Sequence, residues 1–531
     1  MNPWSELMIL GRLLRDLGPF LREPLTPAEC HRRAREGLRR RAGAFLATLD
    51  HGVFRVPSSP YRRLMEHAGV DMPELRRSVE EWGVEGTLAR LHEAGVYVTL
   101  DEFKGRRPIV RGGLTVDTRT RDFDNPLAVR HFMTETGGSR SRGTRVYVDL
   151  AHYEQDAIYD HLFKEAFGLL DRPWGSWRTV PPHGAGIKSH MSRAKLGRRD
   201  VRWFSQTRLR LWSRGWKHAV MSESIYVGSL LWGRPLARPE HVPLSEAWRV
   251  ADWLAACVRQ GSPALLNTNA ASGVRVAMAA LEKGMDISGS TFRLGGEPFT
   301  DGKAEVLRSA GVRWGAHYTM GETGRIGVAC PAGETVDDAH VVEDKIAVIQ
   351  RERRGGSGGP VPVNVYTTLD PTTPKLLLNV ESDDYGTLVR RRCGCLLDDV
   401  GYTLHLHSIR SWEKLTSEGM NFIGADVLRL VDEVLPTRFG GAATDYQFLE
   451  EEEGGLPKVT LLVSPRVGPL DERSVCEAVL QFLGSAPGAG TDYGDRWREG
   501  QTLRVVRREP VATGASKVLA LHSTRKKAER R

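Results

Sequence analysis

The feature that most constrains the fold is an alternation of strand-like and helix-like segments between about residue 128 and residue 410. The strand-like runs are short and apolar, and the segments between them carry apolar residues at helical spacing. The runs are VYVDL, ALLNTN, VRWGAHYTM, KIAVIQ, VNVYTTL and KLLLNV, and the helical stretches include SEAWRVADWLAACVRQ, GVRVAMAALEKG and TDGKAEVLRSAG. Strands that alternate with helices favour a parallel sheet covered by helices. The sequence therefore predicts an α/β domain with a substantial parallel sheet.

The regions before and after this segment have different predicted secondary structure. Residues 1–100 are predicted to be mainly helical, with breaks at Gly83 and Gly95. The last part of the chain is typical of a compact α+β module of about 120 residues. A chain of 531 residues also exceeds the roughly 250–300 residues at which a single core stops growing. We expect a large multi-layer α/β body over residues 1–409 and a small, mobile α+β lid over residues 410–531.

Composition excludes several classes of protein. A chain that is 40% hydrophobic and 27% charged is neither collagen-like, nor low-complexity, nor a disulfide scaffold. No run approaches the ~18–20 apolar residues of a membrane span, and Arg12, Arg15 and Asp16 interrupt the N-terminal apolar run, which is unlike a secretory signal. We expect a cytoplasmic enzyme with no membrane partner. The net charge of +9 favours anionic ligands such as nucleotides or CoA, and it keeps nucleic acid as an alternative, less expected partner.

Three segments are rich in glycine. TGGSRSRGT at residues 136–144 precedes a strand-like run, and its backbone N–H groups and hydroxyls suit an anion. LGGEPFT at 294–300 places a glycine pair after a strand, which allows a flat ligand to approach the backbone closely. RRGGSGGPVP at 353–362 is predicted to be a surface loop and not a phosphate-binding loop, because no helix follows it. Glycine turns between strands are common, so each segment alone indicates little.

Charged residues follow three further segments. Glu322 comes after VRWGAHYTM, where a carboxylate can hold magnesium beside phosphates. The adjacent acids Asp383 and Asp384 come after KLLLNV and suit the two hydroxyls of a ribose. Lys517 lies in a loop near the end of the chain, where one compact cation can face a developing anion. A loop acid, an aspartate turn and a tail lysine explain these residues equally well when each is taken singly.

The order of these segments along one chain is more specific than any single segment. It resembles the adenylate-forming superfamily, and within it the phenylacetate–CoA ligase-like branch. TGGSRSRGT resembles that family's phosphate loop, LGGEPFT its adenine-side segment, HYTMGE its Tyr-Gly-x-Thr-Glu motif, SDDYG its ribose segment and PVATGASK its terminal lysine loop. Ile409–Ser411 resembles the hinge that precedes the small domain. The resemblance covers nearly the whole chain.

The resemblance implies ATP, magnesium and CoA as cofactors or co-substrates, and a small carboxylic acid as substrate. It implies that Lys517 is catalytic and that Glu322 binds magnesium. Asp384 would hold the ribose, Tyr318 would line the nucleotide site, and Arg410 would contact the ribose or a phosphate. The other implied ATP-binding residues are Thr136, Gly137, Gly138, Ser139, Ser141, Thr144, Gly296, Glu297 and Pro298.

The chain departs from the family's pattern in the phosphate loop, in the magnesium motif and in the hinge, where Trp412 and Glu413 stand in place of the usual Asp or Lys. In the phosphate loop, Arg140 and Ser141 stand where the family usually has Thr and Gly, and Gly143 stands where it has Pro. In the magnesium motif Gly321 replaces a threonine, although Thr323 offers a hydroxyl nearby. These departures motivate an alternative in which the chain keeps the fold as a catalytically degenerate scaffold.

A second set of residues has the chemistry of a metal site. Some members of the phenylacetate–CoA ligase-like branch carry a zinc ion. Here Cys330, His340, Cys393 and Cys395 offer three thiols and an imidazole, which are the ligand types of tetrahedral zinc. The Cys-x-Cys pair suits one metal if the backbone turns at Gly394. Four protein ligands leave no open position, so such a zinc would be structural, and ordinary buried cysteines are the alternative.

The expected activity is that of an AMP-forming carboxylate–thiol ligase. ATP would activate a carboxylic acid to an acyl-adenylate with release of pyrophosphate, and transfer to the thiol of CoA would give an acyl-CoA and AMP. Within the same chemistry, the acceptor could instead be the thiol of an acyl carrier protein or an amine. An arginine-rich nucleic-acid binder is the alternative from another class. The sequence names neither the acid nor, between Asp383 and Asp384, the residue that holds the ribose.

Overall fold

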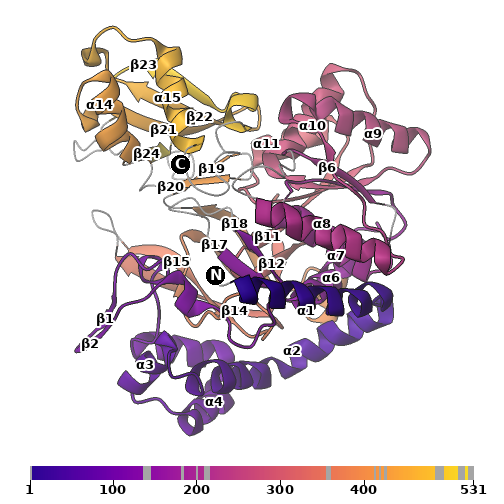
Figure 1. Ribbon diagram of the computed structural model, residues 1–531, viewed down its shortest axis with the longest axis vertical. Coiled ribbons are helices and arrows are strands. Elements are labelled where there is room, and N and C mark those ends of the chain that lie inside the picture. The colour runs from indigo at the N-terminus through magenta and orange to yellow at the C-terminus, as the bar shows by residue number, and fades with distance from the viewer. Residues whose placement is uncertain are drawn as a thin grey trace.

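Figure 1 shows the computed structural model, in which an N-terminal helical region, a central set of sheets and a C-terminal module follow one another along the chain. The structure describes residues 3–135, 145–180, 184–198, 201–207, 216–354, 360–411, 414–417, 420–423, 427, 429–484, 496–511 and 521–523. Among the helices of these segments, none has both the length and the apolar character needed to cross a membrane.

The N-terminal region is mainly helical, as predicted. Its helices α2 (Pro27–Leu49), α3 (Pro60–His67) and α4 (Met72–Glu93) each have a proline at the first or second position, where the fixed φ of proline suits the first helical turn. The hydroxyl of Thr26 caps one of them by accepting a hydrogen bond from the backbone N–H of Glu29 at 3.2 Å. Gly83 has a φ of +69° and kinks another, which confirms the break predicted there. Helix α1 (Pro3–Arg22) precedes these three along the chain.

The predicted parallel sheet is present and has six strands. Its order is β10-β9-β8-β5-β6-β7, and every pairing in it is parallel. The strands are β5 (Trp174–Trp177), β6 (Val201–Ser205), β7 (Glu240–His241), β8 (Leu265–Asn269), β9 (Thr291–Gly295) and β10 (Arg313–Ala316). The predicted helices between them are α9 (Ala247–Arg259), α10 (Ala270–Glu282) and α11 (Asp301–Ser309). They pack their apolar faces against the sheet in one buried cluster that includes Trp177, Leu266 and Phe292.

Two antiparallel sheets follow the parallel one along the chain. The first has the order β11-β12-β13-β18-β17 and the second the order β14-β15-β16. Their strands are β11 (Tyr318–Met320), β12 (Gly324–Ala329), β13 (Ala339–Val341), β14 (Ile346–Arg354), β15 (Pro360–Thr368), β16 (Val380–Glu381), β17 (Asp384–Arg390) and β18 (Leu404–Ser411). Helix α6 (Leu150–Ala166) packs against them within the largest core.

Three sequence predictions need correction in this region. The run VRWGAHYTM is not one strand, because His317 ends the parallel ladder and Tyr318 pairs with β12 in a different sheet. The run KLLLNV forms a strand only at its last residue. Asn379 has a φ of +48°, and the backbone N–H groups of Leu377 and Asn379 donate hydrogen bonds to threonine hydroxyls. The predicted loop at 353–362 is shorter, because its described residues 353–354 and 360–362 are the paired ends of β14 and β15, and residues 355–359 lie outside the described residues.

The C-terminal segments form an α+β module, so the predicted fold class is confirmed. Its sheet has the order β23-β22-β21-β24 and packs against α15 around a separate buried cluster. The elements are α14 (Leu435–Phe439), β21 (Tyr446–Glu453), β22 (Leu456–Val463), α15 (Glu472–Gly484), β23 (Leu503–Arg507) and β24 (Leu521–Ser523). The module contacts the body through Arg275, which donates to the Gly500 carbonyl oxygen at 2.7 Å, and through Thr300, which donates to Glu452 at 2.7 Å. The exact division at residues 409 and 410 stays a prediction.

Candidate active site

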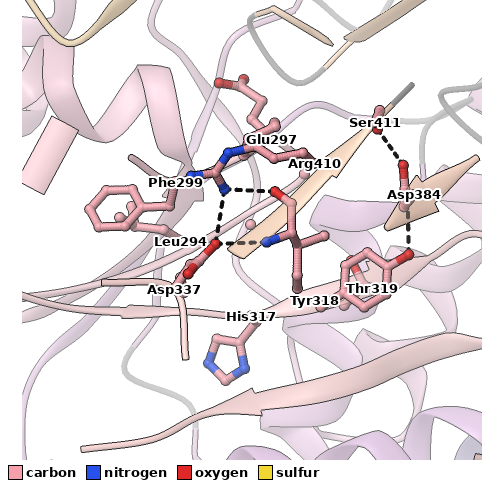
Figure 2. A pocket seen from close by; sticks show the side chains of 15 residues that line it. Leu294, Glu297, Phe299, His317, Tyr318, Thr319, Asp337, Asp384, Arg410 and Ser411 are labelled. Carbon is pink, nitrogen blue, oxygen red and sulfur yellow. Dashed lines mark hydrogen bonds and ion pairs between the residues drawn. The ribbon is translucent and has the colours of Figure 1, made fainter. Parts of the chain in front are cut away.

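A pocket lies where the parallel sheet meets the five-stranded antiparallel sheet (Figure 2). It is partly open to solvent. Five separate stretches of chain supply its walls, and the parallel sheet contributes the carboxyl ends of β9 and β10, the edge where α/β sheets bind ligands. The lining residues are Leu294–Phe299, Ala316–Thr319, Asp337, Asp384 and Ile409–Ser411.

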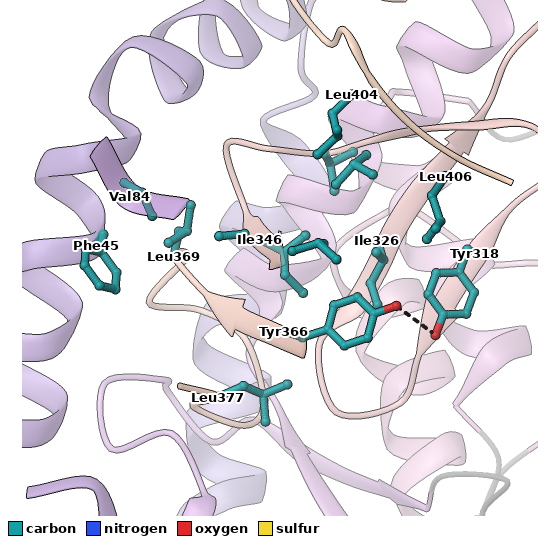
Figure 3. Packing of buried hydrophobic residues seen from close by; sticks show 14 of the residues in the cluster. Phe45, Val84, Tyr318, Ile326, Ile346, Tyr366, Leu369, Leu377, Leu404 and Leu406 are labelled. Atoms are coloured by element: carbon teal, nitrogen blue, oxygen red, sulfur yellow. Dashed lines mark hydrogen bonds between the residues drawn. The ribbon is translucent and has the colours of Figure 1, made fainter. Parts of the chain in front are cut away.

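One side of the pocket is built around the carboxylate of Asp384. Tyr318 Oη donates a hydrogen bond to Asp384 Oδ2 at 2.9 Å, and Ser411 Oγ donates to Asp384 Oδ1. Behind them in the core, Tyr366 Oη donates to Tyr318 Oη at 3.4 Å (Figure 3). Burial and the nearby Asp384 charge raise the pKa of Tyr318 well above its ordinary value. The Tyr318 hydroxyl therefore stays protonated and donates a hydrogen bond. Each carboxylate oxygen of Asp384 can accept more than one hydrogen bond, for example from the hydroxyls of a ligand.

The opposite side is built around Asp337, which orients Arg410. Asp337 accepts hydrogen bonds from the backbone N–H groups of Ser408 and Ile409, each at 3.0 Å, and pairs with an Arg410 nitrogen at 3.1 Å. Ser408 has a φ of +53°, an uncommon backbone state for a residue with a side chain. The Asp337 carboxylate thus fixes the irregular end of this strand and the Arg410 guanidinium in place beside the pocket.

The floor of the pocket is the turn after β9. Gly296 has a φ of +82°, which favours glycine at this position. Glu297 points back across the turn and accepts a hydrogen bond from the backbone N–H of Ala271 at 3.0 Å, near the start of α10. Pro298 completes the turn, and all three residues line the pocket. The backbone is therefore exposed to a ligand here over the length of a tight turn.

Glu322 is placed differently from the other candidates. It is buried in the turn after β11 but is not among the residues that line the pocket. Its Oε1 lies 2.8 Å from Lys104 Nζ. Burial works against the charge, but the ion pair with Lys104 outweighs it and lowers the pKa of Glu322. The neighbouring Thr323 hydroxyl is buried and has no hydrogen-bond partner among the described residues.

The four predicted metal ligands lie together at a different place. The ligand atoms of Cys330, His340, Cys393 and Cys395 are all within 4.8 Å of one another. Cys330 Sγ lies 3.7 Å from Cys393 Sγ, and His340 Nε2 lies 3.6 Å and 3.2 Å from the sulfurs of Cys393 and Cys395. A tetrahedral ion at ~2.3 Å from sulfur and ~2.0 Å from nitrogen separates its ligand atoms by roughly 3.3–3.8 Å. The backbone turns at Gly394, with a φ of +72°, as the sequence required.

The surroundings of this cluster orient its ligands. His340 Nδ1 lies 2.7 Å from the carbonyl oxygen of Tyr402. A carbonyl only accepts, so Nδ1 carries the proton and the lone pair of Nε2 faces the cysteines. Asp398 accepts hydrogen bonds from the backbone N–H groups of Cys393 and Gly394 at 3.0 and 2.9 Å. Both shells of a metal site are therefore present.

Six predicted ATP-site residues come together in the pocket: Gly296, Glu297, Pro298, Tyr318, Asp384 and Arg410. Asp383 is buried but does not line it. The phosphate-loop residues Thr136, Gly137, Gly138, Ser139, Ser141 and Thr144, together with Lys517, lie outside the described residues. The roles given to all of them stay predictions. Asp337 was assigned no role from the sequence, and Ser411 was expected only as part of the hinge segment Ile409–Ser411.

Comparison with known proteins supports the fold. No model of a known protein family matches the sequence, and no curated protein matches it. Among solved structures, a 2-hydroxyisobutyryl-CoA ligase in complex with its acyl-AMP and CoA is similar over 96% of this chain and 93% of that chain, with a TM-score of 0.55 and 16% identity. An o-succinylbenzoate CoA synthetase from Bacillus subtilis is similar over 74% of this chain and 69% of that chain, with a TM-score of 0.42 and 13% identity.

The first of these similarities decides the fold assignment, because it spans nearly both whole chains. This chain therefore has the fold of that ligase.

Proposed function

We propose that this protein is an AMP-forming ligase that joins a small carboxylic acid to a thiol, with CoA as the acceptor. The observation that carries the proposal is the convergence of six residues, predicted from the order of short motifs, on one pocket. They come from four stretches of chain that are far apart in sequence. The full-length similarity to the 2-hydroxyisobutyryl-CoA ligase supports the same reading.

In the proposed first half-reaction, a carboxylate oxygen attacks the α-phosphorus of ATP. The bond from that phosphorus to the bridging oxygen breaks, and pyrophosphate leaves. Asp384 would hold the ribose hydroxyls while Tyr318 fixes its orientation, and Arg410 would contact the ribose or a phosphate. The ammonium of Lys517 would offset the negative charge that builds up as two anions meet. Holding both reactants in line supplies the remaining advantage.

In the proposed second half-reaction, the thiol attacks the acyl carbon and AMP leaves. The hypothesis assigns residues 1–409 to the body and 410–531 to a lid that turns about the hinge beginning at Arg410, withdraws Lys517 and admits CoA. An acyl carrier protein would present the same thiol chemistry. An enzyme that consumes ATP and CoA is expected in the cytoplasm.

Two metals belong to the proposal. Magnesium neutralises triphosphate charge when bound, and Glu322 has the carboxylate it prefers, although a cation there would share that carboxylate with Lys104. Zinc fits the cluster of Cys330, His340, Cys393 and Cys395 in ligand type, spacing and second shell. A structural zinc is also the feature that supports the phenylacetate–CoA ligase-like branch.

The direct test of the proposed function is a pyrophosphate-release screen over aryl, fatty, hydroxy and amino acids, with ATP, magnesium and CoA. We expect pyrophosphate release that depends on one class of acid, together with AMP and a thioester in equal amounts. Replacing CoA by a carrier protein or an amine identifies the acceptor. ATP binding without acid-dependent pyrophosphate release over the whole screen would indicate the degenerate scaffold instead.

Replacing Asp384 by asparagine is expected to weaken ATP binding by about tenfold to a hundredfold, because two charge-assisted hydrogen bonds to the ribose are lost. The matched control is Asp383→Asn, which alters the neighbouring acid that does not line the pocket. Its ATP affinity should stay within about twofold of the native value, as for a site that makes no contact. Calorimetric titration of both variants with ATP decides the question. A larger loss in Asp383→Asn would transfer the ribose role to that residue.

A further inference from the structure

Arg178 is a positively charged side chain at the ligand-binding edge of the parallel sheet that the nucleotide motifs leave without a role. It directly follows β5, and the carboxyl ends of β8 and β9 lie next in the sheet order. In sheets of this kind, ligands bind outside the carboxyl ends of the strands. The contacts proposed for the sugar come from β11, β17 and β18 in the antiparallel sheet, so the end of β5 is available to a different ligand.

The guanidinium of Arg178 is bound only by neutral groups among the residues that the structure describes. It donates to the carbonyl oxygen of Thr268 at 2.6 Å and to the side-chain oxygen of Asn269, with a longer contact of 3.4 Å to Asn267. The neighbouring Arg293 and Arg325, in contrast, both form ion pairs with Asp160, at 2.8 and 2.6 Å. Arg178 has no carboxylate within ion-pair distance in the described part of the chain.

The electrostatics around Arg178 are correspondingly unfavourable. Burial, with the nearby positive charge of Arg293 and Arg496, lowers its pKa to about 9, and Glu297 opposes this only in part. At neutral pH the group therefore still carries its charge. A cation that is partly shielded from water and has no anionic partner is costly, and such groups are found where a ligand or a reaction uses them.

The guanidinium of Arg178 lies next to the pocket floor, although Arg178 itself is not among the residues that line the pocket. A side chain added at Gly295 or Gly296 would start 3.7 Å from a guanidinium nitrogen of Arg178, and both glycines line the pocket. Neither glycine has a side chain that would contact the guanidinium, and Arg178 itself remains partly exposed. The planar fork of an arginine matches a carboxylate in two parallel hydrogen bonds.

We propose that Arg178 binds a second carboxylate of the acid substrate, so that the enzyme prefers dicarboxylic acids and activates them at one end. The proposal rests on the proposed function, because it places the rest of the acid beneath the glycine pair. Arg178 is a specificity residue in this account and takes no part in the bond-forming step. The triphosphate is the competing anion, and the experiment separates the two.

The experiment compares glutarate with pentanoate, and terephthalate with benzoate, by calorimetric titration of the full chain. We expect each dicarboxylate to bind at least about tenfold more tightly than its partner, as for a charge-assisted bidentate contact. Arg178→Gln removes the charge but can keep a hydrogen bond to Thr268, and it should abolish the preference. Arg178→Lys should restore part of it, and the exposed Arg308→Met, which changes an arginine on α11, should leave it intact. Thermal unfolding of each variant confirms folding.

The outcomes separate this inference from the proposed function. Equal affinity within both acid pairs, or a loss of ATP affinity in Arg178→Gln as large as the loss for dicarboxylates, overturns the role of Arg178. Carboxylate-dependent ATP–pyrophosphate exchange that favours monocarboxylic acids and is unchanged in Arg178→Gln supports the ligase but overturns the Arg178 assignment. Dicarboxylate binding that is lost in Arg178→Gln, without any exchange, keeps the binding site and rejects the ligase.

Discussion

Replacing Lys517 by alanine is expected to abolish carboxylate-dependent ATP–pyrophosphate exchange while leaving the protein folded. The proposed reaction brings two anions together, and one mobile ammonium would neutralise charge that appears only in the transition state. Removing such a preorganised group costs about 10²–10³-fold in rate in comparable sites. ATP binding should change far less, because the ribose and adenine contacts are made by other residues.

The described residues that precede and follow Lys517 in the sequence belong to the C-terminal module. Val511 donates its backbone N–H to Gln447 on β21 at 2.7 Å, and Leu521 pairs with Phe448 on the same strand. The matched control is Lys458→Ala, which removes a half-buried lysine of the same module that donates to the Gln501 carbonyl oxygen. Exchange at the native rate in Lys517→Ala, or an equal loss in Lys458→Ala, would contradict the role of Lys517.

The second large effect is expected from the cysteine cluster. The purified protein should contain one zinc ion per chain, and Cys395→Ser should lower that content at least tenfold and destabilise the fold. Metal binding that occurs only in the folded state adds directly to stability, so the loss should reach about 3 kcal/mol or more. Elemental analysis and denaturant unfolding, with and without a chelator, measure both effects.

A control cysteine makes the zinc result specific. Cys476 lies on α15 in the C-terminal module, far in sequence from the cluster, and its thiol is half-buried. Cys476→Ser should keep the zinc content and respond to the chelator as the native protein does. If the native protein carries no metal and the chelator leaves its unfolding unchanged, the cluster is a group of ordinary buried thiols.

Much of the fold could be predicted because local periodicity and burial agree along most of the chain. The helices α9, α10 and α11 and the buried strands β8 and β9 follow their apolar patterns closely. The errors occur where a contact distant in sequence decides the backbone. VRWGAHYTM looks continuous, but its two halves pair with different partners, Leu294 at one side of His317 and β12 at the other. No periodicity in the segment itself contains that information.

Some residues of the candidate site could be predicted from the sequence and others could not, for the same physical reason. Tyr318, Asp384 and Arg410 could be found because each belongs to a motif with an order and a spacing. Asp337 and Arg178 could not, because each is a single charged residue in an ordinary segment. Asp337 gains its role only when the fold brings Ser408 and Arg410 to it, and Arg178 gains its role from what the sheet places around it.

The central claim is that a carboxylate oxygen forms a bond to the α-phosphorus of ATP, and isotope transfer tests it most directly. The accepted acid is prepared with both carboxyl oxygens as ¹⁸O and incubated with ATP, magnesium and CoA. Attack on the α-phosphorus followed by cleavage of the acyl–oxygen bond leaves one labelled oxygen in AMP, which mass spectrometry detects. ADP together with labelled orthophosphate, and no labelled AMP, would instead place the attack at the terminal phosphate and contradict the account.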